Sequence, residues 1–220
     1  MSRSLPLDCR SQRPRRAPDD GRPTNLADVL GEPRPTRNTV CYTCRVSTSV
    51  MRDAFAHHTW ATVRLIDACE GLEPELILRP IPGTYGSILT TLRHIVDSDS
   101  FELFVASGER VPFVKTDAMD LGELRALMEA NDDGWAEILE SNPDPLAIVR
   151  EVDPDDGYTR DAPLGLRLAA AIHHGNDHRS QVCVALTALG IEPPATDPMD
   201  YGLSIGTVSE VYPSGADGSG

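Results

Sequence analysis

Three histidines stand within six residues in the run HHGNDHRSQV. His174 and His178 are four residues apart, so in a helix their imidazoles lie one turn apart on the same face. Two histidines at this spacing can share one metal ion. His173 projects to the opposite side and is predicted to be a surface residue. The run therefore predicts a metal-binding pair.

A third metal ligand is expected at His94, in the run GSILTTLRHIVDSD. His94 shares a helical stripe with Ser87, Thr91 and Ser98, small or polar residues that leave room for a cavity. Two histidines from one helix and one from another resemble catalytic three-histidine zinc sites, in which water or substrate fills the open positions. Zinc or nickel is favoured, while iron or manganese also suits such ligands. The alternative is that the histidines are hydrogen-bonded core residues.

Helical periodicity places these residues on four long helices of an all-α domain. The expected helices cover about 51–71, 87–107, 121–141 and 163–189. Asp120 and Glu123 form a capping-box-like start for the third helix. Residues 144–162 hold no helix, although 146–152 could form an extended segment before a turn. Joined mostly by modest loops, these helices predict an antiparallel four-helix bundle, whose interior can hold a metal site.

The first 50 residues differ from the rest of the chain in composition. They contain nine arginines against five acidic residues, are rich in Pro, Ser and Thr, and lack hydrophobic periodicity. We therefore expect a disordered or upstream extension over 1–50, the folded domain over 51–203 and a flexible tail over 204–220. Cys41 and Cys44 form a C-x-x-C pair, a weak signal for a zinc or redox site without a second pair.

The net charge of the chain is −14, which repels nucleic acids and anionic lipid surfaces. Neither nucleic acid nor a membrane is therefore an expected partner. No apolar run reaches the length of a signal sequence or a spanning helix, so the predicted location is the cytoplasm. The five scattered cysteines do not form the pattern of a disulfide framework.

Four segments together resemble the DinB/YfiT-like family of metal-binding four-helix bundles: FAHHTWATVRLIDACEGL, GSILTTLRHIVDSD, HHGNDHRSQV and LGIEPPATD. The resemblance covers residues 51–203 and rests on the order and spacing of these segments. It implies one histidine ligand on the second helix, His94, and a paired set on the fourth, His174 and His178. The paired set ends in a His-Arg-small-Gln motif, which here includes Arg179 and Gln181.

The resemblance implies a metalloenzyme that uses a low-molecular-weight thiol such as mycothiol, bacillithiol or glutathione. The first hypothesis is a metal-dependent thiol S-transferase acting on small electrophiles. One alternative is a metal-dependent hydrolase, for which Asp97 and Asp177 are the nearest carboxylates, both predicted at the rim. Another is a noncatalytic, stress-associated metal-binding dimer, with Phe104 and Trp60 on its partner surface. A homodimer is expected in either case, and the sequence assigns no catalytic residue.

Three further residues have predicted roles near the histidines. Gln181 lies one turn after His178 and is expected to orient a ligand or a bound water. Arg179 is expected to form an interhelical salt bridge, or to pair with a substrate carboxylate. His58 shares a helical stripe with Phe55 and could border the cavity, where it would contact substrate or support a metal ligand.

Overall fold

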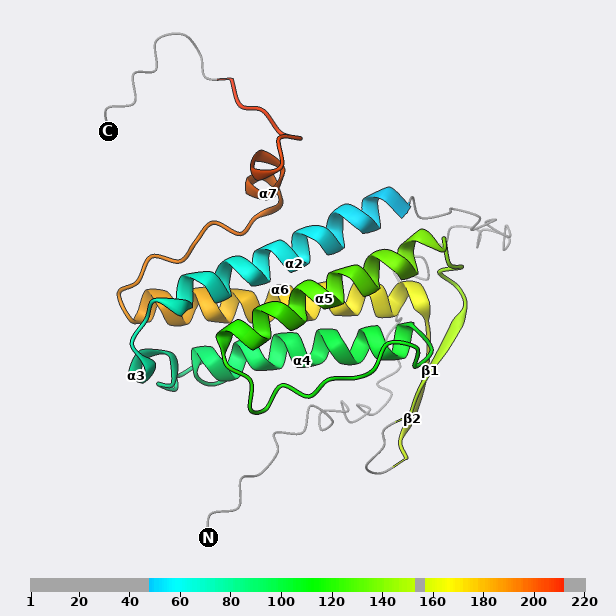
Figure 1. Cartoon of the computed structure of the whole chain (residues 1–220), viewed down its shortest axis with the longest axis horizontal. Coiled ribbons are helices and arrows are strands. Elements are labelled where there is room, and N and C mark those ends of the chain that lie inside the picture. Colours follow the sequence, from blue (N-terminus) through cyan, green and yellow to red (C-terminus); the bar gives the residue numbers. More distant parts are fainter. Residues whose placement is uncertain (1–47, 153–156, 212–220) are drawn as a thin grey trace, which may run out of the picture. The chain divides into compact units, whose positions relative to one another are not determined.

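The computed structural model describes residues 48–152 and 157–211. This part of the chain is mostly helical, with one small two-stranded sheet (Figure 1). Its elements are α2 (Thr48–Glu70), α3 (Pro74–Ile77), α4 (Ile88–Ala106), α5 (Leu121–Glu140), β1 (Ile148–Val152), β2 (Thr159–Pro163), α6 (Leu164–Ala188) and α7 (Pro198–Ser204). None of the described helices is long and apolar enough to cross a membrane. The extension predicted over 1–50 lies almost entirely outside the described residues, as does its C-x-x-C pair.

The four long helices begin and end near their predicted positions, and α4 and α5 carry side-chain caps at their starts. Ser87 precedes α4, and its hydroxyl accepts a hydrogen bond from the Thr90 backbone N–H. The predicted capping box is present at the start of α5. There the Glu123 N–H donates to Asp120 and the Asp120 N–H donates to Glu123, both at 2.9 Å. These contacts join near neighbours in the chain, so sequence patterns predict them well.

The long helices form two antiparallel pairs (Figure 1). α2 is antiparallel to α5, since Arg52 pairs with Glu140 and Asp67 pairs with Arg125. α4 is antiparallel to α6, whose residues contribute to the site described below. α2 also packs on α6, and α4 also packs on α5.

The predicted antiparallel arrangement does not hold between α4 and α5, which run in the same direction. Asp99 in α4 bonds to Asn131 in α5, and Leu103 one turn later lies against Gly134. Residues 107–120 make this possible because they return along α4 before α5 begins (Figure 1). In that return the Val114 N–H donates to Ser100. A connection of this length permits parallel neighbours, whereas a short loop would not.

Two groups of buried apolar side chains fill the space between the long helices. The periodicity predicted the inward faces correctly, and most of the predicted stripe residues are buried. One group is rich in aliphatic residues and includes Leu65, Ile66, Leu92, Met128 and Leu186. The other is built on two aromatic rings in contact, those of Phe55 and Trp135, and also includes Leu103, Leu164 and Leu168.

A β-hairpin joins α5 to α6. Residues 148–152 form the strand β1, inside the segment predicted to be extended, and pair antiparallel with β2. The sequence pattern did not predict β2, because its residues TRDAP are polar and mostly exposed. The hairpin is tied to the helices by Arg167 of α6, whose buried guanidinium pairs with Glu151 of β1 and Glu102 of α4.

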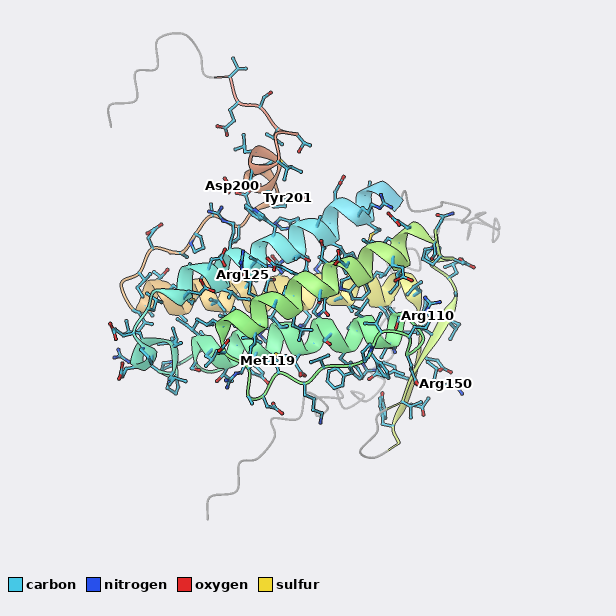
Figure 2. The ribbon with its side chains drawn as sticks, in the orientation of Figure 1. Arg110, Met119, Arg125, Arg150, Asp200 and Tyr201 are labelled. Carbon is cyan, nitrogen blue, oxygen red and sulfur yellow. The ribbon has the colours of Figure 1, made fainter. Side chains whose placement is uncertain are left out.

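The C-terminal part packs further than the predicted domain end at residue 203. Tyr201 of α7 lies against the α2 rings of Trp60, at a centroid distance of 5.5 Å, and of His57, at 5.9 Å (Figure 2). The backbone N–H groups of Thr207 and Val208 then donate to Gly202. Thr207 and Val208, inside the tail predicted over 204–220, thus contact α7, and residues 212–220 lie outside the described part.

Candidate metal centre

His94, His174 and His178 lie together between α4 and α6. Each offers one ring nitrogen, and these three atoms lie within 4.8 Å of one another. The Nε2 atoms of His94 and His174 are 3.0 Å apart. Because α4 and α6 are antiparallel, the histidine on α4 meets the one-turn pair on α6. The tertiary structure thus brings together the three residues that the sequence predicted as ligands.

The electrostatics of the cluster suit a cation. Burial, and to a smaller extent the neighbouring histidines, lower the pKa of His94 and of His174 from 6.5 to about 4. Both imidazoles are therefore neutral at pH 7, with a lone pair available on a ring nitrogen. Neutral imidazole is the form that binds zinc and other transition metals. Three converging ring nitrogens, two of them on neutral imidazoles, are a donor set that fits a divalent metal.

Gln181 orients the third histidine. Its Oε1 accepts a hydrogen bond from the Tyr85 backbone N–H at 2.8 Å and lies 3.2 Å from His178 Nδ1. An amide oxygen has no hydrogen to donate and can only accept hydrogen bonds. The proton shared with Gln181 therefore belongs to Nδ1 of His178. Its Nε2 is left with the lone pair. Metal-binding histidines commonly hold their second ring nitrogen in this way.

Tyr85 covers the cluster, a role that the sequence did not predict. Its ring stacks on His94 with centroids 4.1 Å apart and an angle of 8° between the planes. It also meets the His178 ring edge-on at 5.2 Å. Tyr85 lies in the loop before α4, where Gly83 adopts a φ of +85°. The only signal in the sequence is an aromatic residue in a glycine-rich turn just before the His94 helix.

A cavity of about 260 Å³ opens beside His94. The carboxyl group of Asp97 lines it, as do Tyr85, Thr90, Arg93, Thr116 and Asp117. Asp97 accepts a hydrogen bond from the Thr116 N–H at 3.2 Å. Burial raises the pKa of Asp97. Asp177, the other predicted carboxylate, is exposed and does not line this cavity.

His58 and Arg179 belong to a buried network beside the cluster. Arg179 Nη1 donates to His58 Nδ1 at 2.8 Å, and His58 Nε2 donates to Asp99 at 3.2 Å. Asp99 also accepts from Asn131 and from the indole N–H of Trp135. The network joins all four long helices. The sequence missed Asp99, because a single Asp on a helix gives no sign of burial.

The predicted salt bridge of Arg179 is replaced by a contact with an imidazole. Within residues 48–152 and 157–211, no carboxylate lies within 4.0 Å of its nitrogens. Burial lowers the pKa of Arg179 to about 10, so the side chain remains a cation at neutral pH. Among the described residues, the His58 ring forms no hydrogen bond with His94, His174 or His178.

Other residues singled out by the sequence lie away from the cluster. His173 is exposed, as predicted. His57 was expected to face outward but is half-buried, and its Nε2 donates to the Thr196 carbonyl at 2.9 Å. Segment 196–201 covers it, which helical phase alone cannot reveal. Trp60 and Phe104, predicted on a partner surface, are partly exposed and contact aromatic neighbours.

Comparison with known proteins supports the resemblance that the motifs indicate. The sequence profile of the DinB family matches residues 46–204, which is most of the chain and includes all three histidines of the cluster. No curated protein matches the chain.

Proposed function

Since this chain belongs to the DinB family and brings His94, His174 and His178 together, we propose that it binds a divalent metal and acts as a thiol S-transferase on small electrophiles. The observation that carries the proposal is the convergence of three histidine ring nitrogens beside a cavity. The pairwise packing of α2, α4, α5 and α6 also supports classification as a four-helix bundle.

Three imidazole ligands favour zinc or nickel, and iron or manganese is also compatible with them. A metal with three protein ligands keeps open positions, at which it would hold a low-molecular-weight thiol as the thiolate near neutral pH. Gln181 keeps the Nδ1 proton of His178 in place, so that the Nε2 lone pair stays available. Tyr85 packs on His94 and limits its rotation.

The protein's described cysteines are unsuited to act as the nucleophile. Burial raises the pKa of Cys69 to about 12 and also raises the pKa of Cys183. A thiol with a raised pKa is almost entirely protonated at pH 7, and the protonated form is a poor nucleophile. This supports a mechanism in which the reacting sulfur comes from a separate thiol substrate.

A metal-dependent hydrolase is the second candidate, and one observation favours it. Asp97 lines the same cavity as His94, and burial raises its pKa. A carboxylate with a raised pKa at this position can accept a proton from an attacking water. The two candidates share the metal ligands and differ in whether activity needs a thiol and whether it needs Asp97.

The metal site is tested by elemental mass spectrometry on the full-length protein purified without an affinity tag. We expect about one metal per chain in the wild type, and loss of most of it in His94→Ala and His178→Ala. The matched control is His173→Ala, on the same helix but exposed, which retains the metal. A wild type that cannot be loaded with zinc, nickel or manganese would show that the histidines are structural.

The reaction is tested on the metal-loaded protein with monobromobimane, which becomes fluorescent when a thiol sulfur displaces bromide. Mycothiol, bacillithiol and glutathione are supplied in turn, and the uncatalysed rate is subtracted. Thiol-dependent turnover that His94→Ala abolishes is the expected result. Hydrolysis of a nitrophenyl ester without thiol, lost in Asp97→Asn, would favour the hydrolase. Turnover of neither substrate by fully loaded protein would contradict both candidates.

A further inference from the structure

A second cavity, of about 550 Å³, lies between α2, α6 and the segment that contains α7. This volume is within the range of small-molecule pockets. Its walls are largely apolar and include Ala54, Ile172, Met199 and Val208. The aromatic contacts of Tyr201 with α2 hold α7 over it (Figure 2).

One buried cation lines this cavity. Arg179 is only 3% exposed, and its Nη1 contacts His58 Nδ1 and, at 3.3 Å, Thr62 Oγ1. Its Nε and Nη2 have no hydrogen-bond partner among the described residues. Arg179 is among the residues that line the cavity.

The free edge of Arg179 has the geometry of a carboxylate site. The Nε–Nη2 edge presents two parallel N–H groups, which match the two oxygens of a carboxylate. Elsewhere in this structure Arg150 uses the same two atoms to bind the carboxylate of Asp161, with both distances 2.7 Å. At Arg179 the corresponding two atoms have no hydrogen-bond partner among the described residues, whose bonds to this side chain all use Nη1.

The cavity is separate from the histidine cluster. It lies on the side of α6 that carries His173, Asn176 and Arg179, and none of the three clustered histidines lines it. Asp53 also lines the cavity, and the chain as a whole carries a charge of −14. A ligand with two negative charges is therefore disfavoured relative to a monoanion.

We propose that this cavity binds a small organic monocarboxylate, with its carboxylate on the Nε–Nη2 edge of Arg179 and its apolar body between Ile172, Met199 and Val208. The apolar walls bury the body of such a ligand, and the guanidinium neutralises its charge. This inference does not depend on the proposed metal chemistry.

The proposal is tested by isothermal titration of the full-length protein with sodium hexanoate. A ligand of this size in a preformed pocket is expected to bind one per chain with a Kd on the order of 1 mM or below. Hexanol, which has the same apolar body without the charge, should bind roughly tenfold more weakly or worse. Absence of binding up to about 10 mM hexanoate would overturn the proposal.

Variants locate the binding. Ala54→Leu fills the cavity and should weaken hexanoate binding roughly tenfold or more. The matched control, Ala170→Leu on an exposed position of α6, should leave binding unchanged. Arg179→Gln should also weaken binding at least about tenfold. If circular dichroism shows that Arg179→Gln does not fold, Ala54→Leu still tests the proposal. An unchanged affinity of Ala54→Leu for hexanoate would exclude this cavity as the binding site.

A final variant separates the two sites, because a carboxylate can also bind a metal. His94→Ala removes a cluster histidine on α4 and leaves the lining of the second cavity untouched. Hexanoate binding that survives this substitution supports the cavity. Binding lost in His94→Ala would assign the carboxylate to the histidine cluster and refute the proposal.

Discussion

Replacing Asp99 with alanine will strongly destabilise the fold. Its carboxylate is 3% exposed and accepts hydrogen bonds from His58 Nε2 at 3.2 Å, Asn131 Nδ2 at 2.9 Å and Trp135 Nε1 at 3.1 Å. The donors lie on α2 and α5, whereas Asp99 lies on α4. One side chain therefore links three helices, and its charge also faces the buried cation of Arg179.

The size of the effect follows from these contacts. A hydrogen bond to a charged group contributes about 1.5–3 kcal/mol to stability. The sum over three such bonds exceeds the stability that a single substitution usually removes. The sum is an upper limit, because water can enter the space left by the side chain and the bonds are not independent. Removing one partner of a buried charge pair costs about 3–5 kcal/mol. We expect a loss of this size, a large fraction of the roughly 5–15 kcal/mol that stabilises a typical domain.

The assay is urea unfolding of metal-free protein, followed by far-ultraviolet circular dichroism. Asp133→Ala, at an exposed position of α5, is the control and should change the free energy of unfolding by less than about 0.5 kcal/mol. Trp135→Phe keeps an aromatic side chain but removes the indole N–H and part of the buried ring, and should cost roughly 1–3 kcal/mol. A double-mutant cycle with Asp99→Ala then measures their coupling. A loss below about 1 kcal/mol in Asp99→Ala would refute the reasoning.

Three further predictions concern stability. Metal-free protein should lose stability as the pH falls from about 6.5 to about 4, because His94 and His174 have a pKa of about 4 when folded and the unfolded chain takes up protons first. Urea unfolding midpoints measured across this pH range with a chelator present check this. Midpoints that do not change with pH would contradict it. Gly175→Ala should lower the thermal midpoint, since a Cβ there would overlap the His58 ring, and an unchanged midpoint would show that the ring can move aside. Asp120→Ala should lower the free energy of unfolding by about 1 kcal/mol, measured in urea, because the capping box of α5 is lost. A change near zero would show that the capping box does not stabilise α5.

The helices and the ligand pair were predictable because their signals are local. The one-turn spacing of His174 and His178, and the cap formed by Asp120 and Glu123, depend on residues three or four apart in the chain. Periodicity also identified His94 as facing inward. The strand β2 was missed because its polar residues pair through the backbone, and its burial pattern carries no alternation.

The roles of Arg179 and His57 were not predictable for a different reason. Arg179 was expected to meet a carboxylate, and His57 was expected to face solvent. Both expectations rest on the position of a residue around its own helix. Their actual partners, His58 on α2 for Arg179 and the Thr196 carbonyl for His57, come from segments far away in the chain.

The sequence by itself determined which residues form the four long helices, which faces of those helices are apolar, and which three histidines point inward. Those properties follow from backbone hydrogen bonding and side-chain spacing within one segment. Only the tertiary structure decided that α4 and α5 run in the same direction, that Tyr85 stacks on His94, and that Asp99 connects three helices. These contacts depend on the path of long connections and on the packing of distant segments, and no local pattern encodes either.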